Sequence, residues 1–95
     1  MSGRQLVFRV HALQAMFRRG ITQADVLHVL ATGKTIENYP ADQPYPSRLV
    51  LGWRGVRPIH VVFADNEAER ETIIITVYEP DPDRWEPGFE TRRKS

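Results

Sequence analysis

One histidine stands inside a run that is otherwise typical of a buried β-strand, Pro58-Ile-His-Val-Val-Phe63. Alternate residues of a strand share a face, so His60 lies on the face opposite to its two apolar neighbours. Pairing this run with Ile73–Tyr78 as an antiparallel hairpin, apolar face against apolar face, puts His60 on the same face as Thr76 and Tyr78. The sequence therefore predicts a polar cluster on one face of a sheet.

The residue types in and around this cluster suit RNA cleavage without a metal. That reaction needs a base for the 2′-hydroxyl proton, an acid for the leaving 5′-oxygen and cations around the phosphate. His60 and His11 are the candidate base and acid, because an unperturbed imidazole has a pKa of about 6.5. Tyr78 is an alternative acid, or a surface on which a base stacks. The candidate substrate-binding residues are Arg18, Arg19, Arg48 and Thr76.

Each candidate also has a purely structural interpretation. His60 suits a half-buried residue that is hydrogen-bonded to a neighbouring threonine or a backbone carbonyl. His11 suits a residue that bonds the first turn of a helix, where the helix dipole disfavours an imidazolium. Arg19 suits an ion pair with Asp25 or Glu37. The sequence leaves both sets of alternatives open.

Neither a metal nor a cofactor is expected. The histidines, His11, His28 and His60, have no helical or strand spacing that makes them converge, and Asp81-Pro-Asp83 is typical of a turn. With no cysteine in the chain, disulfides and thiolate ligands are excluded. We find no nucleophile elbow, glycine-rich phosphate loop or dinucleotide fingerprint.

The length and composition predict one small cytoplasmic domain. The 95 residues, 41% hydrophobic and 26% charged, are ordinary for a globular protein. We expect a single domain over residues 1–95, with a core over about 6–90 and a flexible tail at 91–95. No apolar run approaches the roughly 20 residues that cross a bilayer, and the N-terminus lacks the apolar core of a secretory signal. No membrane partner is therefore expected.

Basic and acidic residues are unevenly distributed along the chain. Residues 1–60 carry eight Arg and Lys against three Asp and Glu, whereas residues 61–95 carry five against nine. Eleven of the thirteen basic residues are Arg, the side chain best suited to bidentate contact with phosphate or carboxylate. This favours a local anion site. The alternative is a solvated surface with ion pairs between the two halves.

Two helices are predicted before the strands begin. The first covers Val10–Arg19, with Val10, Leu13 and Phe17 as its buried stripe and Gly20 as its C-terminal cap. The second begins after Thr22, which forms a capping box with Asp25, and ends at Thr32, where Gly33 supplies a left-handed residue. The residues expected to bury the second helix are Val26, Val29 and Leu30.

The rest of the chain predicts an antiparallel meander. The expected strands are Lys34–Tyr39, Arg48–Arg54, Arg57–Ala64 and Thr72–Glu79. A three-residue turn at 55–57 would put Leu49, Leu51 and Trp53 on the same face as Ile59, Val61 and Phe63. The sequence does not decide whether residues 6–9 add an edge strand. The predicted fold class is α+β, with two helices on one face of an antiparallel sheet of about four strands.

The last segment leaves the sheet after a Pro80-Asp-Pro-Asp83 turn. Two large aromatic residues follow, Trp85 and Phe89. We expect both to fold back over an exposed apolar edge of the sheet, since such side chains are better suited to a core or a lid than to solvent.

Several short motifs, taken in order, resemble one small prokaryotic family. They are His11-Ala, Arg19-Gly-Ile21, Gly33-Lys-Thr-Ile-Glu37 with Tyr39, Pro44-Tyr-Pro-Ser47, His60-Val-Val62, and Thr76-Val-Tyr-Glu-Pro-Asp81 with Trp85. Over residues 6–93 this pattern resembles the family called domain of unknown function 4258. That family is similar in layout to the RelE and BrnT type ribonuclease toxins. The resemblance implies a RelE-like fold, RNA or a ribosome as substrate and an antitoxin protein as partner, although a fold does not transmit function reliably.

Two functions follow as hypotheses. The first is a metal-independent endoribonuclease of toxin–antitoxin type, for which His11, His60 and Tyr78 must lie within hydrogen-bond or one-water reach. The second is a non-catalytic module that binds a protein or an anion through the same fold. The sequence leaves the oligomeric state open.

Overall fold

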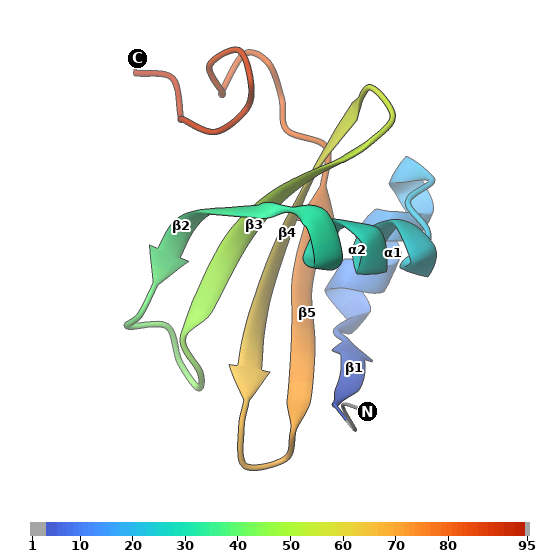
Figure 1. The fold of residues 1–95 in the computed structure, drawn as a ribbon, viewed down its shortest axis with the longest axis vertical. Coiled ribbons are helices and arrows are strands. Elements are labelled where there is room, and N and C mark those ends of the chain that lie inside the picture. Colours follow the sequence, from blue (N-terminus) through green and yellow to red (C-terminus); the bar gives the residue numbers. More distant parts are fainter. Residues whose placement is uncertain (1–3, 95) are drawn as a thin grey trace.

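Two helices cover one face of a five-stranded sheet in the computed structural model, which describes residues 4–94 (Figure 1). The elements in chain order are β1 Gln5–Phe8, α1 Val10–Arg19, α2 Gln23–Thr32, β2 Lys34–Tyr39, β3 Ser47–Arg54, β4 Arg57–Asn66 and β5 Glu71–Tyr78. The strand order across the sheet is β1-β5-β4-β3-β2. The predicted α+β class is confirmed.

The sheet is mixed, and the prediction of about four antiparallel strands is wrong in this respect. Residues Gln5–Phe8 form β1, which pairs in parallel with β5, while the other three strand pairs are antiparallel. The partner of Gln5 is Glu71. A local pattern cannot reveal a partner so far along the chain, which is why the sequence left this strand undecided.

The turn between β3 and β4 has two residues, so the predicted three-residue turn is wrong. Arg54 pairs with Arg57, and the turn residue Gly55 has a φ of 63°, as a type II′ turn requires at its first position. With this register Leu51 lies opposite His60. The residues that share the face of His60 are therefore Leu49, Leu51 and Trp53, and they are not on the face of Ile59, Val61 and Phe63. The prediction assumed that only one face of the sheet is apolar, whereas both faces are buried.

The predicted pairing of β4 with β5 is confirmed around the histidine. His60 pairs with Tyr78, and Val62 pairs with Thr76, so the three polar side chains share one face. A bulge follows, because Phe63 pairs with Ile74. The bulge returns Ile74 to the face that the helices cover, where it is fully buried.

Helix α1 has the predicted bounds, but the side that it packs against the sheet is opposite to the predicted one. Its C-terminal cap Gly20 is left-handed, with a φ of 65°, as expected. The buried side chains are Ala12, Ala15 and Met16. The predicted stripe of Val10, Leu13 and Phe17 is exposed, so that prediction is wrong. Two alanines on the inner side let the helix backbone lie close to the sheet, which the larger residues would prevent.

Helix α2 begins with the predicted capping box between Thr22 and Asp25. Gly33, however, is extended, with a φ of −79°, so the predicted left-handed conformation is wrong. Glycine is required there by close approach, since a Cβ would lie 2.4 Å from the carbonyl oxygen of Val29. At Gly52 of β3 a Cβ would likewise lie 2.8 Å from Val29 Cγ1. Helix α2 therefore lies directly on the backbone of β3.

Replacing Gly52 by Ala should separate α2 from the sheet. We expect Gly52→Ala to lower the free energy of unfolding by about 1–3 kcal/mol, because the new methyl group overlaps Val29. Urea denaturation measures this change. The control is Val56→Ala, at an exposed turn residue, which should stay within about 0.5 kcal/mol of the wild type. Equal stability of the two variants would contradict the close packing of α2.

Candidate functional site

The segment after β5 turns back at one end of the sheet (Figure 1), and it packs there on the part of the second face that carries His60 and Trp53. Trp85 is buried, and its ring meets the ring of His60 edge to face, with centroids 4.5 Å apart. Phe89 meets Trp53 in the same way at 6.1 Å. The prediction that Trp85 and Phe89 fold back is confirmed, but they cover a face of the sheet instead of an edge.

His60 is fully buried and takes part in a chain of hydrogen bonds. Its Nε2 lies 2.9 Å from the carbonyl oxygen of Phe89, and its Nδ1 lies 3.2 Å from the hydroxyl of Tyr78. A carbonyl only accepts, so Nε2 must donate. In a neutral imidazole Nδ1 then accepts, and the Tyr78 hydroxyl donates to it. This assignment fixes the tautomer of His60.

Burial keeps both members of this chain uncharged. It lowers the pKa of His60, although the hydrogen bond to the Phe89 carbonyl acts in the opposite direction. Burial also raises the pKa of Tyr78. Charged forms are disfavoured away from water, so a neutral imidazole and a protonated phenol are present near pH 7. The structural interpretation of His60, in which it forms a hydrogen bond to a backbone carbonyl, is confirmed. Within residues 4–94, no hydrogen bond joins His60 to Thr76.

Tyr78 also forms part of the wall of a cleft with a volume of about 320 Å³. The cleft lies between the end of α1, the end of β5 and the C-terminal segment. Its lining residues are Arg19, Tyr78, Glu79, Asp81, Arg84, Trp85 and Arg92. The structure therefore brings together two residues predicted from the sequence, Arg19 and Tyr78.

Two of the three arginines in the cleft have no carboxylate partner among residues 4–94. Arg92 holds Glu37 through two hydrogen bonds of 2.9 and 3.1 Å, and its guanidinium lies 4.7 Å above the Trp85 ring. No ion pair between residues 4 and 94 involves Arg19 or Arg84. Their charges are available to an anion from solution.

Neighbouring ion pairs fix the walls of the cleft. Arg57 pairs with Glu79 and also donates to the carbonyl oxygens of Arg19 and Gly20, which anchors the end of α1. Burial acts to raise the pKa of Glu37, but its hydrogen bonds from Arg92 and a tyrosine outweigh this effect and lower the pKa overall. Glu37 is therefore a carboxylate, and it holds Arg92 in place.

Other predicted site residues lie elsewhere. His11 and Arg18 are exposed on α1, which packs on the face of the sheet opposite to His60. The structure does not bring His11 together with His60 and Tyr78. The predicted ion pair of Arg19 with Asp25 is not formed, because Asp25 pairs with Arg54 at 2.8 Å.

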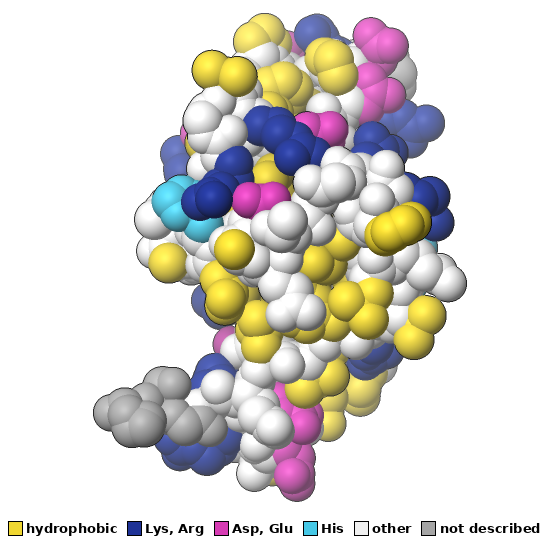
Figure 2. Space-filling view, turned by 90° about the vertical axis from the view of Figure 1, so that its right-hand side faces the viewer, with side chains coloured by type: hydrophobic (Ala, Val, Ile, Leu, Met, Phe, Trp, Pro, Cys, Tyr) yellow, Lys and Arg dark blue, Asp and Glu magenta, His cyan; other side chains and the backbone are white. Residues whose placement is uncertain are grey.

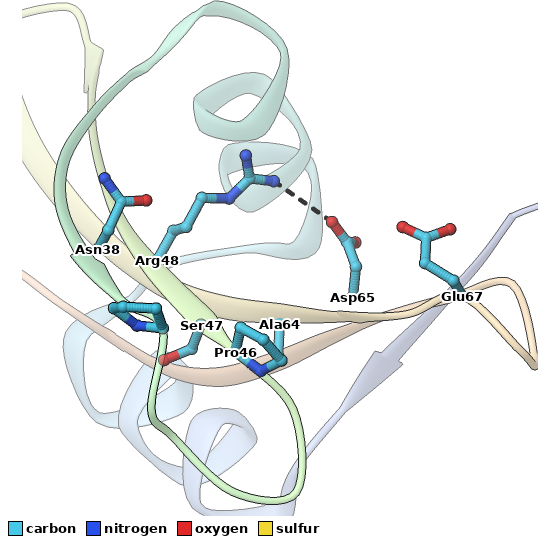
Figure 3. Close-up of a pocket in the computed structure, with 8 residues that line it drawn as sticks. Asn38, Pro46, Ser47, Arg48, Ala64, Asp65 and Glu67 are labelled. Carbon is cyan, nitrogen blue, oxygen red and sulfur yellow. Dashed lines mark hydrogen bonds and ion pairs between the residues drawn. The ribbon is translucent and has the colours of Figure 1, made fainter.

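A second pocket contains Arg48, the remaining candidate (Figure 3). Its volume of about 390 Å³ is larger than that of the cleft. The Arg48 side chain extends toward Asp65, at 3.3 Å, and its guanidinium lies 4.7 Å above the Phe63 ring. Asp65 also lies 3.6 Å from Arg4. The charges of this pocket are already paired, so it offers less to an anion than the cleft does.

Neither a group of metal ligands nor a membrane-spanning helix is found among residues 4–94. Among residues 4–94, no group of three His, Cys, Asp or Glu side chains is placed to hold a metal ion. The helices of this part of the chain are too short or too polar to cross a membrane.

Comparison with known proteins identifies the family. The model of DUF4258, a domain of unknown function, matches residues 8–79. The chain belongs to the DUF4258 family. The matched region contains Arg19, His60 and Tyr78 and ends before Arg84 and Arg92. No curated protein and no solved structure matches the chain, so the RelE-like layout stays a prediction.

Arg84 and Arg92 are the site residues that the sequence did not indicate. Arg92 falls in the segment 91–95 that was predicted to be a flexible tail, yet it bonds Glu37, and Arg93 donates to the carbonyl oxygen of Pro82. Residue 95 lies outside the described residues. A signal was present, because Arg84 and Arg92 flank the two aromatic residues that were expected to fold back.

The buried His60 should make stability depend on pH. Its pKa in the folded protein lies below the ordinary 6.5 of the unfolded chain. Between pH 6.5 and the lower pKa of the folded protein, only the unfolded chain binds the proton. The stability that His60 contributes is therefore fully present above pH 6.5, and it is lost as the pH falls from 6.5 toward the folded pKa. We expect up to about 1.4 kcal/mol to be lost per pH unit in urea denaturation.

The exposed His11 provides the control, since His11→Asn removes an imidazole on the other side of the sheet from His60 and should leave this slope unchanged. The imidazole of His60 can also be titrated directly by NMR in the folded wild type. Titration at the ordinary value of 6.5 would contradict the lowered pKa.

Proposed function

We propose that the protein is a metal-independent endoribonuclease whose site is the cleft between Arg19 and Tyr78. One observation carries the proposal. A tyrosine whose hydroxyl is hydrogen-bonded to a buried neutral histidine lines the same cleft as three arginines, two of which have no carboxylate partner in the described part of the chain. In a toxin–antitoxin module, RNA on the ribosome would be the substrate and an antitoxin protein would be the partner.

The arginines would bind the phosphate. A guanidinium donates in a planar fork that matches two phosphate oxygens, and it stays charged at any physiological pH. Arg19 and Arg84 would bind the non-bridging oxygens. Arg92, held by Glu37, would stabilise the negative charge that develops on the phosphate and the leaving oxygen.

Tyr78 and His60 would move the proton. The 2′-hydroxyl gives its proton to the Tyr78 oxygen while the Tyr78 proton passes to His60 Nδ1, which accepts in the assigned tautomer. The 2′-oxygen then bonds to phosphorus and the bond to the 5′-oxygen breaks. The 5′-oxygen takes a proton from water in the open cleft. The products are a 2′,3′-cyclic phosphate and a 5′-hydroxyl, and His60 returns its proton to solvent through Tyr78.

A non-catalytic anion-binding module is the second candidate. The observation that favours it is the complete burial of His60, both of whose nitrogens have partners inside the protein. In such a module the hydrogen-bond chain would only hold the C-terminal segment on the sheet. The same arginines would bind phosphate without breaking it.

Cleavage and binding can be measured separately on one labelled single-stranded RNA, with EDTA present. We expect Tyr78→Phe to slow cleavage by about a hundredfold, because the proton path is lost, and to bind RNA as the wild type does. Arg84→Ala should weaken binding about tenfold, since one charged hydrogen bond to phosphate is removed. The matched control is Arg48→Ala in the second pocket, which should change neither quantity.

The outcomes separate the two candidates. Binding that depends on Arg84 without any cleavage by the wild type would favour the module over the enzyme. Absence of both, or an equal loss in Arg48→Ala, would reject the cleft as the site.

A further inference from the structure

Helix α1 carries large apolar side chains on its outer surface. Val10, Leu13 and Phe17 are 69%, 42% and 89% exposed. Their spacing of three and four residues places them on one stripe, opposite to the buried alanines and Met16. Figure 2 looks onto the side of the molecule that carries α1, and hydrophobic side chains gather there beside Lys and Arg.

Such a stripe is unusual for a surface helix. Single exposed apolar residues are common and need no explanation. A surface helix normally has one apolar stripe and one polar face, whereas a helix that is apolar on both sides is typical of a buried position. Helix α1 is buried against the sheet by its small residues and leaves its larger ones outside. Its outer side therefore resembles a contact surface.

The charges that α1 and its flanking residues carry are of one sign. Arg9, Arg18 and Arg19 lie at the two ends of the helix, and the sequence from Arg4 to Ala24 contains no Asp or Glu. No ion pair within residues 4–94 involves any of these three arginines. A second copy of the chain would place the same positive charges against each other. A negatively charged partner is favoured instead.

We propose that the outer stripe of α1 is a docking surface for an acidic amphipathic helix of a partner protein. The stripe runs over about 10 Å, the length of two helical turns. A partner helix with apolar residues at positions i, i+3, i+4 and i+7 would cover Val10, Leu13 and Phe17. Its Asp and Glu residues, placed beside the apolar stripe, would face Arg9 and Arg18.

Phe17 is the expected anchor of this contact. It is the most exposed of the three side chains, and a Phe offers a large apolar area with few bonds to immobilise. Interfaces commonly depend on a few aromatic and Arg residues near their centre. The arginines supply specificity, because carboxylates on the partner match them and a basic or neutral helix does not.

The test uses synthetic peptides with fluorescence anisotropy as the readout. The probe is a blocked helical peptide with Leu at i, i+3, i+4 and i+7 and Glu on both sides of this stripe. One control peptide has Lys in place of every Glu, and another has the same composition in scrambled order. We expect only the acidic amphipathic peptide to bind the wild-type chain.

Variants of the chain assign the binding to α1. Phe17→Ser and Arg18→Glu should each weaken binding of the peptide by about tenfold or more. Val56→Ser is the matched control, because Val56 is 94% exposed but lies in the turn between β3 and β4, and it should bind as the wild type does. Circular dichroism checks that each variant is folded.

Several results would overturn the proposal. Equal binding of the scrambled peptide would mean that charge alone is recognised. Binding to vesicles of anionic phosphatidylglycerol without binding to the peptide would make the stripe a membrane contact. A dimer that Phe17→Ser dissociates would make it a self-association surface. Absence of peptide binding, or an equal loss in Val56→Ser, would also reject it.

Discussion

A fully buried imidazole is the constraint on which the candidate site depends. His60 lies between the sheet and Trp85, where water cannot supply hydrogen bonds, so both of its nitrogens need partners within the protein. One partner is Tyr78 on the neighbouring strand, and the other is a carbonyl of the C-terminal segment, that of Phe89. The bond to Phe89 ties the segment to the sheet. The placement of Arg84 and Arg92 follows from it, because both belong to that segment.

Features set by short-range geometry could be predicted from the sequence. The shared face of His60, Thr76 and Tyr78 follows from the period of two residues in a strand, and the structure confirms it. The capping box at Thr22 follows from residue types three positions apart. Both arguments need only neighbours within one helix or one hairpin, which is why they succeed.

Features that depend on what covers a surface could not be predicted in this way. The β3–β4 turn was assigned on the assumption of one apolar face, but Leu51 is buried on the second face, beside His60, which the C-terminal segment covers. The apolar stripe of α1 was assigned to the core because its side chains are the larger apolar ones, but the alanines of the helix form the side that packs on the sheet. Arg92 was missed because its partner Glu37 lies 55 residues away. In each case the deciding contact is made with a segment that is distant in the sequence.

Helix α1 links the two surfaces proposed here, because its last residue, Arg19, lines the cleft while its outer stripe carries Val10, Leu13 and Phe17. Both proposed ligands, an RNA phosphate and an acidic helix, are anions. An acidic partner on α1 would lower the positive potential at Arg19 over the short range at which salt leaves charges unscreened, roughly 8–10 Å. Thermodynamic linkage then requires each ligand to weaken the binding of the other by the same factor. The basic character of α1 would thus make the partner an inhibitor of the cleft, without any change of shape.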